Sequence, residues 1–155
     1  MKTIIVYASK YGAAGVAAQR IADKINGAAV HNLKNGNAKI ADYDCVIIGG
    51  SIYAGMIRKE VKKFVTQNLE ALIQKKIGLF ISSMEAENGM KYIESNFSPE
   101  IRRIAKATCC VGGIFDPKKA GFLDRFIMKI VAKKLVYMDT LNNKKIEEFA
   151  EAMKK

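Results

Sequence analysis

Residues 3–12 read TIIVYASKYG, a nearly continuous apolar run that stops at a short loop containing Gly12. A run of this kind is typical of a strand buried on both faces of a parallel sheet. In residues 13–25, which follow, apolar side chains recur at helical spacing. A buried strand, a tight loop and a helix in this order predict the first unit of an α/β fold.

The same alternation continues to the end of the chain. Further strands are predicted at residues 28–33, 44–50, 77–82 and 108–115, and further helices at residues 57–72, 90–96, 99–105 and 142–153. Alternating strands and helices predict right-handed crossovers and a five-stranded parallel sheet with helices on both faces. The strand order 2-1-3-4-5 suits five strands and places a ligand site between strands 1 and 3. We therefore predict a three-layer α/β fold that forms one domain over residues 1–155.

Composition limits the class of protein. The 155 residues are 50% hydrophobic with only two prolines, which is enough for one globular domain with a sizeable core. A spanning helix would need about 20 apolar residues, and the sequence has no such run. The first residues also lack the pattern of a signal peptide, so the expected location is the cytoplasm.

Histidine and cysteine usage argues against a metal centre. His31 is the only histidine, which excludes a site built from several histidines. Cys45, Cys109 and Cys110 form no C-x-x-C pair, and each lies inside an apolar run, as expected of inert buried thiols. We expect no bound metal.

The chain is strongly basic. Lys and Arg outnumber Asp and Glu by 26 to 15, which gives a net charge of +11. This excess favours an anionic partner such as phosphate, acidic lipid or nucleic acid, although a solvated basic surface accounts for it equally well. Nucleic acid is the weakest of these options because the lysines are dispersed and no aromatic stacking platform accompanies them.

Three loops are predicted to meet at the carboxyl ends of the strands. The first is Ser9, Lys10, Tyr11, Gly12, Ala13 and Ala14. A phosphate placed there would meet unpaired backbone N–H groups and the positive end of a helix dipole. The loop matches neither the P-loop nor the G-x-G-x-x-G pattern, and an ordinary strand-to-helix turn remains the alternative.

The second and third loops would flank the same crevice. The second contains Ser51, Ile52, Tyr53, Ala54 and Gly55, and the third contains Ser82, Ser83 and Met84. Tyr53 is placed to stack on a planar ligand, or else it packs on its own helix. Glu85, which belongs to the third loop, is expected to face solvent.

The first two loops resemble those of the flavodoxin family. The family pattern [ST]-x-[TYF]-G-x-[TS] is matched by Ser9, Tyr11 and Gly12, whereas Ala14 stands where a hydroxyl residue is expected. Residues 49–55, GGSIYAG, resemble the G-x-S-x-[YWR]-x-G loop that flanks the isoalloxazine ring in that family. The resemblance implies a flavodoxin-like fold with FMN as the cofactor, held by the loop residues named above.

An additional segment, at about residues 116–138, interrupts the regular alternation. Residues 121–137, GFLDRFIMKIVAKKLVY, predict a basic amphipathic helix. Its apolar face would carry Phe122, Leu123, Phe126, Ile127, Ile130, Val131 and Leu135, flanked by Arg125, Lys129, Lys133 and Lys134. Such a helix can lie on anionic lipid or dock a partner. Alternatively, Phe122, Phe126 and Ile130 pack on the sheet edge as core.

This segment resembles one particular group of flavodoxin-like proteins. Asp124, Arg125, Phe126, Ile127 and Lys129 match the D-R-F-[IM]-x-K core of an insert in the flavodoxin-like, menaquinone-dependent protoporphyrinogen oxidases. The resemblance implies an FMN oxidoreductase that oxidises protoporphyrinogen in heme biosynthesis and passes electrons to a quinone. The basic amphipathic pattern of residues 121–137 adds the expectation of peripheral contact at the inner face of the cell membrane. The alternatives are an electron carrier between protein redox partners and a fold relative that lost its flavin. No catalytic side chain is identified.

Overall fold

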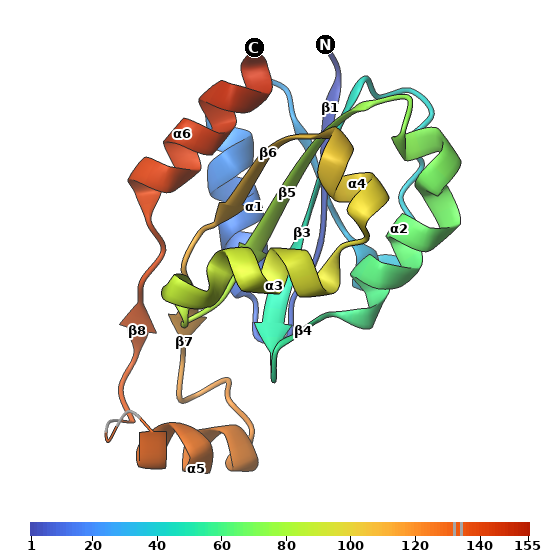
Figure 1. Cartoon of the computed structure of the whole chain (residues 1–155). Helices are drawn as coiled ribbons and strands as arrows, with labels where there is room; N and C mark the ends of the chain where they lie inside the picture. Colours follow the sequence, from blue (N-terminus) through green and yellow to red (C-terminus); the bar gives the residue numbers. More distant parts are fainter. Residues whose placement is uncertain (132, 134) are drawn as a thin grey trace.

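A parallel sheet runs through the middle of the computed structural model, which describes residues 1–131, 133 and 135–155 (Figure 1). Its parallel strands are β1 (Thr3–Ala8), β2 (Ala29–Asn32), β3 (Cys45–Tyr53), β5 (Lys76–Ser82) and β6 (Ala105–Cys110). They lie in the order β2-β1-β3-β5-β6. Counted along the chain this is the order 2-1-3-4-5, so the predicted fold class is confirmed.

Helices cover both faces of the sheet (Figure 1). The helices are α1 (Ala13–Lys24), α2 (Lys59–Leu72), α3 (Gly89–Asn96), α4 (Pro99–Ile104) and α6 (Asn143–Lys154), with short 3-10 turns at Leu33–Asn35 and Ala86–Asn88. Successive side chains of a strand point to opposite faces, so Ile4 and Val6 pack with α2 to α4, whereas Ile5 packs with α1 and α6. Two separate cores result, one on each side of the sheet.

Strand β3 is longer than predicted. It continues through Ser51, Ile52 and Tyr53 and then pairs with the short antiparallel strand β4 (Met56–Ile57). The two residues between them, Ala54 and Gly55, have φ angles of 49° and 76°, as a tight hairpin turn requires. Residues 51–53, predicted as loop, are strand, and the helix predicted from residue 57 begins at Lys59, because β3 continues into a hairpin before the chain reaches α2 (Lys59–Leu72).

The glycines at the end of β3 serve packing. An added Cβ at Gly49 would overlap the ring of Phe80, and one at Gly50 would lie 2.9 Å from Ile57 Cγ1. Both positions lie in the interior, where adjacent strands and α2 approach closely.

The fifth parallel strand was predicted at residues 108–115 but spans Ala105–Cys110. The chain turns at Gly112, whose φ of 87° is left-handed. Beyond the turn, Ile114–Phe115 forms β7, which pairs antiparallel with β8 (Met138–Asp139). The double glycine thus ends the strand and opens a two-stranded base for the segment that follows.

That segment carries helix α5 (Phe122–Val131), which lies below the carboxyl ends of the strands (Figure 1). The predicted helix over residues 121–137 is too long at its carboxyl end, because Lys133 has a left-handed φ of 54°. Lys134 and the side chain of Val131, both assigned to this helix by the sequence pattern, lie outside the described residues.

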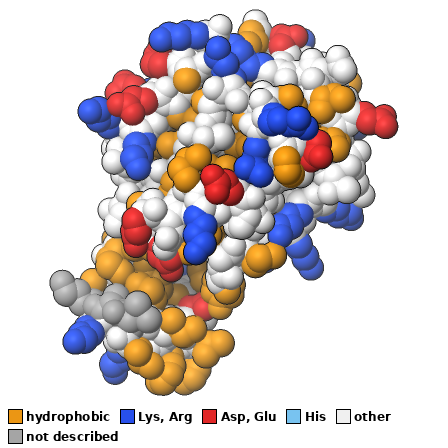
Figure 2. Space-filling model, in the orientation of Figure 1, with side chains coloured by type: hydrophobic (Ala, Val, Ile, Leu, Met, Phe, Trp, Pro, Cys, Tyr) orange, Lys and Arg blue, Asp and Glu red, His pale blue; other side chains and the backbone are white. Residues whose placement is uncertain are grey.

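The apolar face of α5 is exposed. Phe122 is 83% exposed, Phe126 55% and Ile130 60%, and Leu123 and Ile127 are also exposed. Figure 2 shows these hydrophobic side chains gathered at the lower end of the molecule. The expectation that Phe122, Phe126 and Ile130 pack on the sheet edge was therefore wrong.

In the part of the chain that the structure describes, the exposed apolar side chains of α5 are not part of a membrane-spanning helix. Within the described residues, no helix combines the length and the apolar character needed to cross a bilayer. The exposed apolar side chains of α5 lie instead on one face of a ten-residue helix.

The predicted state of the cysteines is confirmed. Cys45, Cys109 and Cys110 are buried and unbonded. Burial raises the pKa of the Cys109 thiol to about 11, so this side chain stays neutral near pH 7. A neutral buried thiol is a poor nucleophile, which agrees with a packing role.

The central strand β3 should dominate stability. Ile47→Ala removes a fully buried side chain in this strand and should lower the free energy of unfolding by about 2–5 kcal/mol. Ile73→Ala, the same change at a site that is 47% exposed, should cost far less. Urea unfolding of both variants tests this, and equal losses would contradict the central place of β3.

Candidate functional site

The loop after β1 is held in shape by Ser9. The Ser9 Oγ accepts hydrogen bonds from the backbone N–H groups of Gly12 at 2.9 Å and Ala14 at 3.3 Å. Gly12 adopts a left-handed φ of 98° at the N-cap of α1, and nothing lies within 4 Å of the place where a Cβ would be. The loop therefore turns tightly and leaves open space at the positive end of the helix dipole.

Ser51 joins the first and second segments of the site. The backbone N–H of Lys10 donates to Ser51 Oγ at 3.0 Å. This bond is possible because β1 and β3 are neighbours, with Ala8 opposite Gly50 in the parallel register. Residues 41 positions apart in sequence thus form one continuous wall.

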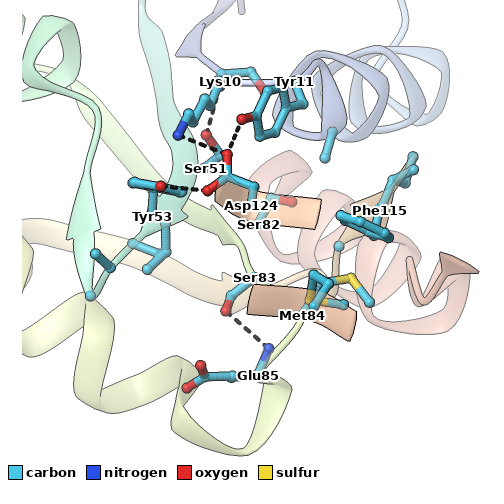
Figure 3. A pocket seen from close by; sticks show the side chains of 18 of the residues that line it. Lys10, Tyr11, Ser51, Tyr53, Ser82, Ser83, Met84, Glu85, Phe115 and Asp124 are labelled. Atoms are coloured by element: carbon cyan, nitrogen blue, oxygen red, sulfur yellow. Dashed lines mark hydrogen bonds and ion pairs between the residues drawn. The ribbon is translucent and has the colours of Figure 1, made fainter. Parts of the chain in front are cut away.

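Tyr53 stands on that wall and is 36% exposed. The Lys10 ammonium lies 3.1 Å from the centroid of the Tyr53 ring, within the range of a cation–π contact. The alternative in which Tyr53 packs on its own helix does not hold, because its ring faces Lys10 and the cavity (Figure 3).

The third segment follows β5. Ser82 and Ser83 are buried, and the Ser83 backbone N–H donates to the Gly112 carbonyl at 3.0 Å. Ser83 Oγ accepts the backbone N–H of Glu85 at 3.1 Å. Glu85 is exposed as predicted, yet it also lines the cavity. Hydrogen bonds from Tyr92 and Asn88 lower the pKa of its carboxyl group, which therefore stays ionised.

A fourth segment, α5, contributes a residue that loop reasoning missed. Asp124 is only 9% exposed, and its carboxylate accepts hydrogen bonds from the hydroxyl groups of Tyr11 and Tyr53 (Figure 3). It also pairs with the Lys10 ammonium at 3.1 Å. The sequence carried a signal for it, since Asp124 is the only acidic residue in the basic segment 121–137.

These contacts keep Asp124 charged. Burial raises the pKa of its carboxyl group, but the hydrogen bonds from Tyr11, Tyr53 and Lys10 outweigh this effect, and the pKa is lowered overall. Burial of Lys10 lowers the pKa of its ammonium group, but interactions with Tyr53, Asp124 and Tyr11 outweigh this effect, and the pKa is raised overall. An ion pair therefore links α5 to the loop after β1.

The four segments enclose a cavity of about 450 Å³. Its volume falls in the range of small-molecule sites, about 300–1,000 Å³. It is lined by all of the predicted site residues except Gly12 and Ala14, namely Ser9, Lys10, Tyr11, Ala13, Ser51, Ile52, Tyr53, Ala54, Gly55, Ser82, Ser83 and Met84. Residues that were not predicted complete the lining: Glu85, Tyr92, Gly113, Ile114, Phe115, Asp124, Ile127 and Met128.

The lining fits a ligand that is both planar and anionic. Tyr53 and Phe115 lie on opposite sides of the cavity in Figure 3, and Met84 and Met128 add apolar surface. The loop after β1 places the positive end of the α1 dipole and the Lys10 ammonium at one end. Ala14 is fully buried among the core residues of α1, so it contributes no side chain to the cavity.

Solved structures share this fold. Oxidised flavodoxin 2 from Bacillus cereus is 19% identical with a TM-score of 0.65, and the match covers 99% of this chain and 98% of that one. A flavoprotein in complex with FMN from Lactobacillus acidophilus is 18% identical with a TM-score of 0.52, covering 72% of this chain and 90% of that one.

A larger protein also contains this fold. Rubredoxin oxygen:oxidoreductase from Desulfovibrio gigas is 16% identical with a TM-score of 0.60, covering 99% of this chain, which spans only 36% of that protein. The comparison with curated proteins gives no match. At these identities the likeness concerns the fold alone.

The sequence also matches a family model, that of the flavodoxin domain, over residues 4–141. The matched range contains the loops after β1, β3 and β5 as well as α5, so it covers every segment of the cavity. The chain belongs to the flavodoxin domain family.

Proposed function

We propose that this chain is an FMN-dependent oxidoreductase that oxidises a porphyrinogen and passes the electrons to a quinone at the inner face of the cell membrane. One observation carries the proposal. The cavity of a flavodoxin-family domain is lined in part by α5, whose Asp124-Arg125-Phe126 core resembles the insert of the menaquinone-dependent protoporphyrinogen oxidases.

FMN fits the residues that are present. The loop after β1 offers the positive end of the α1 dipole and the Lys10 ammonium for the phosphate. Tyr53 offers an aromatic face, and the apolar side chains of Phe115 and Met128 line the cavity beyond it. When bound there, FMN would supply the redox chemistry, accepting electrons from a donor and passing them on.

The protein's own part would be to position the substrates and to exclude water. Lys118, Lys119 and Arg125 are exposed near the segment that carries α5, and Lys59 is exposed after the β3–β4 hairpin. Such cations would attract the propionate groups of a tetrapyrrole. Ile127 and Met128 would shield the cavity from solvent while α5 is docked against it.

The exposed face of α5 supports contact with anionic lipid. Phe122, Phe126 and Ile130 share one face of the helix, and Arg125 and Lys129 follow it along one side. Each basic residue near an anionic surface contributes about 1 kcal/mol, and the net charge of +11 acts in the same direction. A quinone that resides in the bilayer would then lie close to the cavity.

A second function, electron transfer between protein partners, has its own support. Flavodoxin 2 from Bacillus cereus aligns with this chain over nearly the full length of both. In that case α5 would dock a redox protein in place of lipid, and an acidic partner would suit the basic surface.

The first test is FMN binding. The wild-type chain should bind FMN one to one, with a resolved flavin absorbance spectrum. Tyr53→Ala should weaken binding about tenfold because the aromatic face is lost. The matched variant Tyr53→Phe keeps the ring and should bind at least as well as wild type. No binding at tens of micromolar FMN would favour a fold relative that lost its flavin.

The second test concerns the membrane. The chain should sediment with vesicles of phosphatidylglycerol and phosphatidylcholine, and much less with phosphatidylcholine alone. Arg125→Gln with Lys129→Gln should weaken this binding roughly thirtyfold, since two charges are removed. Lys63→Gln with Lys155→Gln removes two exposed charges elsewhere and is the control. Equal losses of vesicle binding in both double variants would mean that binding depends on the total charge and not on the basic residues of α5.

The third test separates the two functions. With FMN bound, the oxidoreductase should consume protoporphyrinogen and reduce menaquinone over many turnovers. The Arg125→Gln and Lys129→Gln double variant should lose most of this turnover when the quinone is held in vesicles. Absence of turnover, together with rapid electron exchange with an acidic redox protein, would favour the electron carrier.

A further inference from the structure

The Asp124 carboxylate is bonded to side chains that FMN would also need. Lys10 and Tyr11 belong to the loop after β1, where the phosphate is expected, and Tyr53 is the expected aromatic face. Figure 3 shows all three side chains converging on Asp124. One carboxylate therefore uses donors from both the loop after β1 and the end of β3.

A carboxylate and a phosphate attract the same kinds of donor. Both are anions with several oxygen acceptors, and both bind lysine ammonium and tyrosine hydroxyl groups. Two such anions on one set of donors would repel each other. In addition, the Lys10 ammonium lies over the Tyr53 ring at 3.1 Å from its centroid, which covers the face that a planar ring would use.

Helix α5 has few other attachments among the described residues. Phe122, Leu123, Phe126 and Ile130 point away from the protein and are exposed. The contacts that hold the helix start are those of Asp124 and a hydrogen bond from the Gly121 backbone N–H to the Tyr11 hydroxyl oxygen at 3.2 Å. The Tyr11 hydroxyl group therefore takes part in both contacts, donating to Asp124 and accepting from Gly121.

We propose that Asp124 is a latch that holds α5 against the cavity, and that FMN releases the helix by taking Lys10, Tyr11 and Tyr53 from it. The proposal rests on FMN as the ligand of this cavity. Because the two anions compete, FMN binding and docking of α5 oppose each other, and each weakens the other by the same factor. FMN would thereby free the helix that carries the exposed apolar face.

The test compares Asp124→Asn with Asp116→Asn. Asp116 lies in the same segment, and its carboxylate accepts only the Lys118 backbone N–H at 2.9 Å among the described contacts. Both changes remove one negative charge. Asp124→Asn should tighten FMN binding about tenfold, since the competing ion pair is lost. Asp116→Asn should leave the dissociation constant unchanged.

Hydrogen exchange of residues 121–131 gives a readout independent of flavin chemistry. In wild-type protein, FMN should speed exchange in this range. In Asp124→Asn, exchange should already be fast without FMN. Tyr53→Phe, which keeps the ring but loses the hydroxyl donor, should also speed exchange in protein stripped of FMN.

Other outcomes overturn one proposal or the other. If Asp124→Asn binds FMN more weakly or equally well, or if FMN slows exchange in residues 121–131, the latch is wrong, and Asp124 instead belongs to the flavin-bound site or only to the fold. If the wild-type chain binds no FMN, the proposed function fails first, and the exchange data on Asp124→Asn then report only how α5 is held.

Discussion

The site depends on the parallel pairing of β1 with β3. With Tyr7 opposite Gly49 and Ala8 opposite Gly50, β1 ends beside the point where β3 continues into Ser51. The loop after β1 and the hairpin after β3 therefore begin at the same edge of the sheet, and the bond from the Lys10 backbone N–H to Ser51 Oγ ties them together. A shift of this register by one residue would turn buried side chains to the wrong face and separate the two walls of the cavity. Packing of the two cores against both faces thus keeps the ligand loops in place.

Most of the sheet and its helices could be predicted from periodicity. Residues 3–8 and 77–82 are apolar without alternation, which leaves few choices other than a strand buried on both faces. Chain order and handedness then determine where the loops meet, so the cavity lining was largely foreseen without knowledge of any contact. The loops needed the resemblance for their chemistry, since neither Ser9 nor Tyr53 belongs to a motif that is specific by itself.

The missed features have physical causes. Ala54 adopts a left-handed φ, which alanine disfavours, so no turn signal marked the hairpin after β3. The helical pattern of residues 121–137 continues past Lys133, where the backbone turns. Hydrophobic periodicity indicates which residues share a helix face, but it does not indicate where the helix ends. The partners of Asp124 lie more than 70 positions earlier in the chain, and only tertiary structure brings them together. Exposure of the α5 face was equally beyond the sequence, since an amphipathic pattern fits a core as well as a docking surface.

Helix α5 joins two environments that an isolated flavodoxin-like sheet would keep apart. Asp124 and Met128 are four residues apart and face the cavity, whereas Phe122, Phe126 and Ile130 form a stripe that faces away. A helix of ten residues is too short to be stable alone, so its position depends on what each face contacts. The inner face is held by the buried Asp124 carboxylate and by the Gly121–Tyr11 hydrogen bond, and the outer face has apolar and basic character suited to an anionic surface. A change in the contacts of one face therefore changes the binding free energy of the other face. This coupling makes α5 the place where ligand binding and docking influence each other.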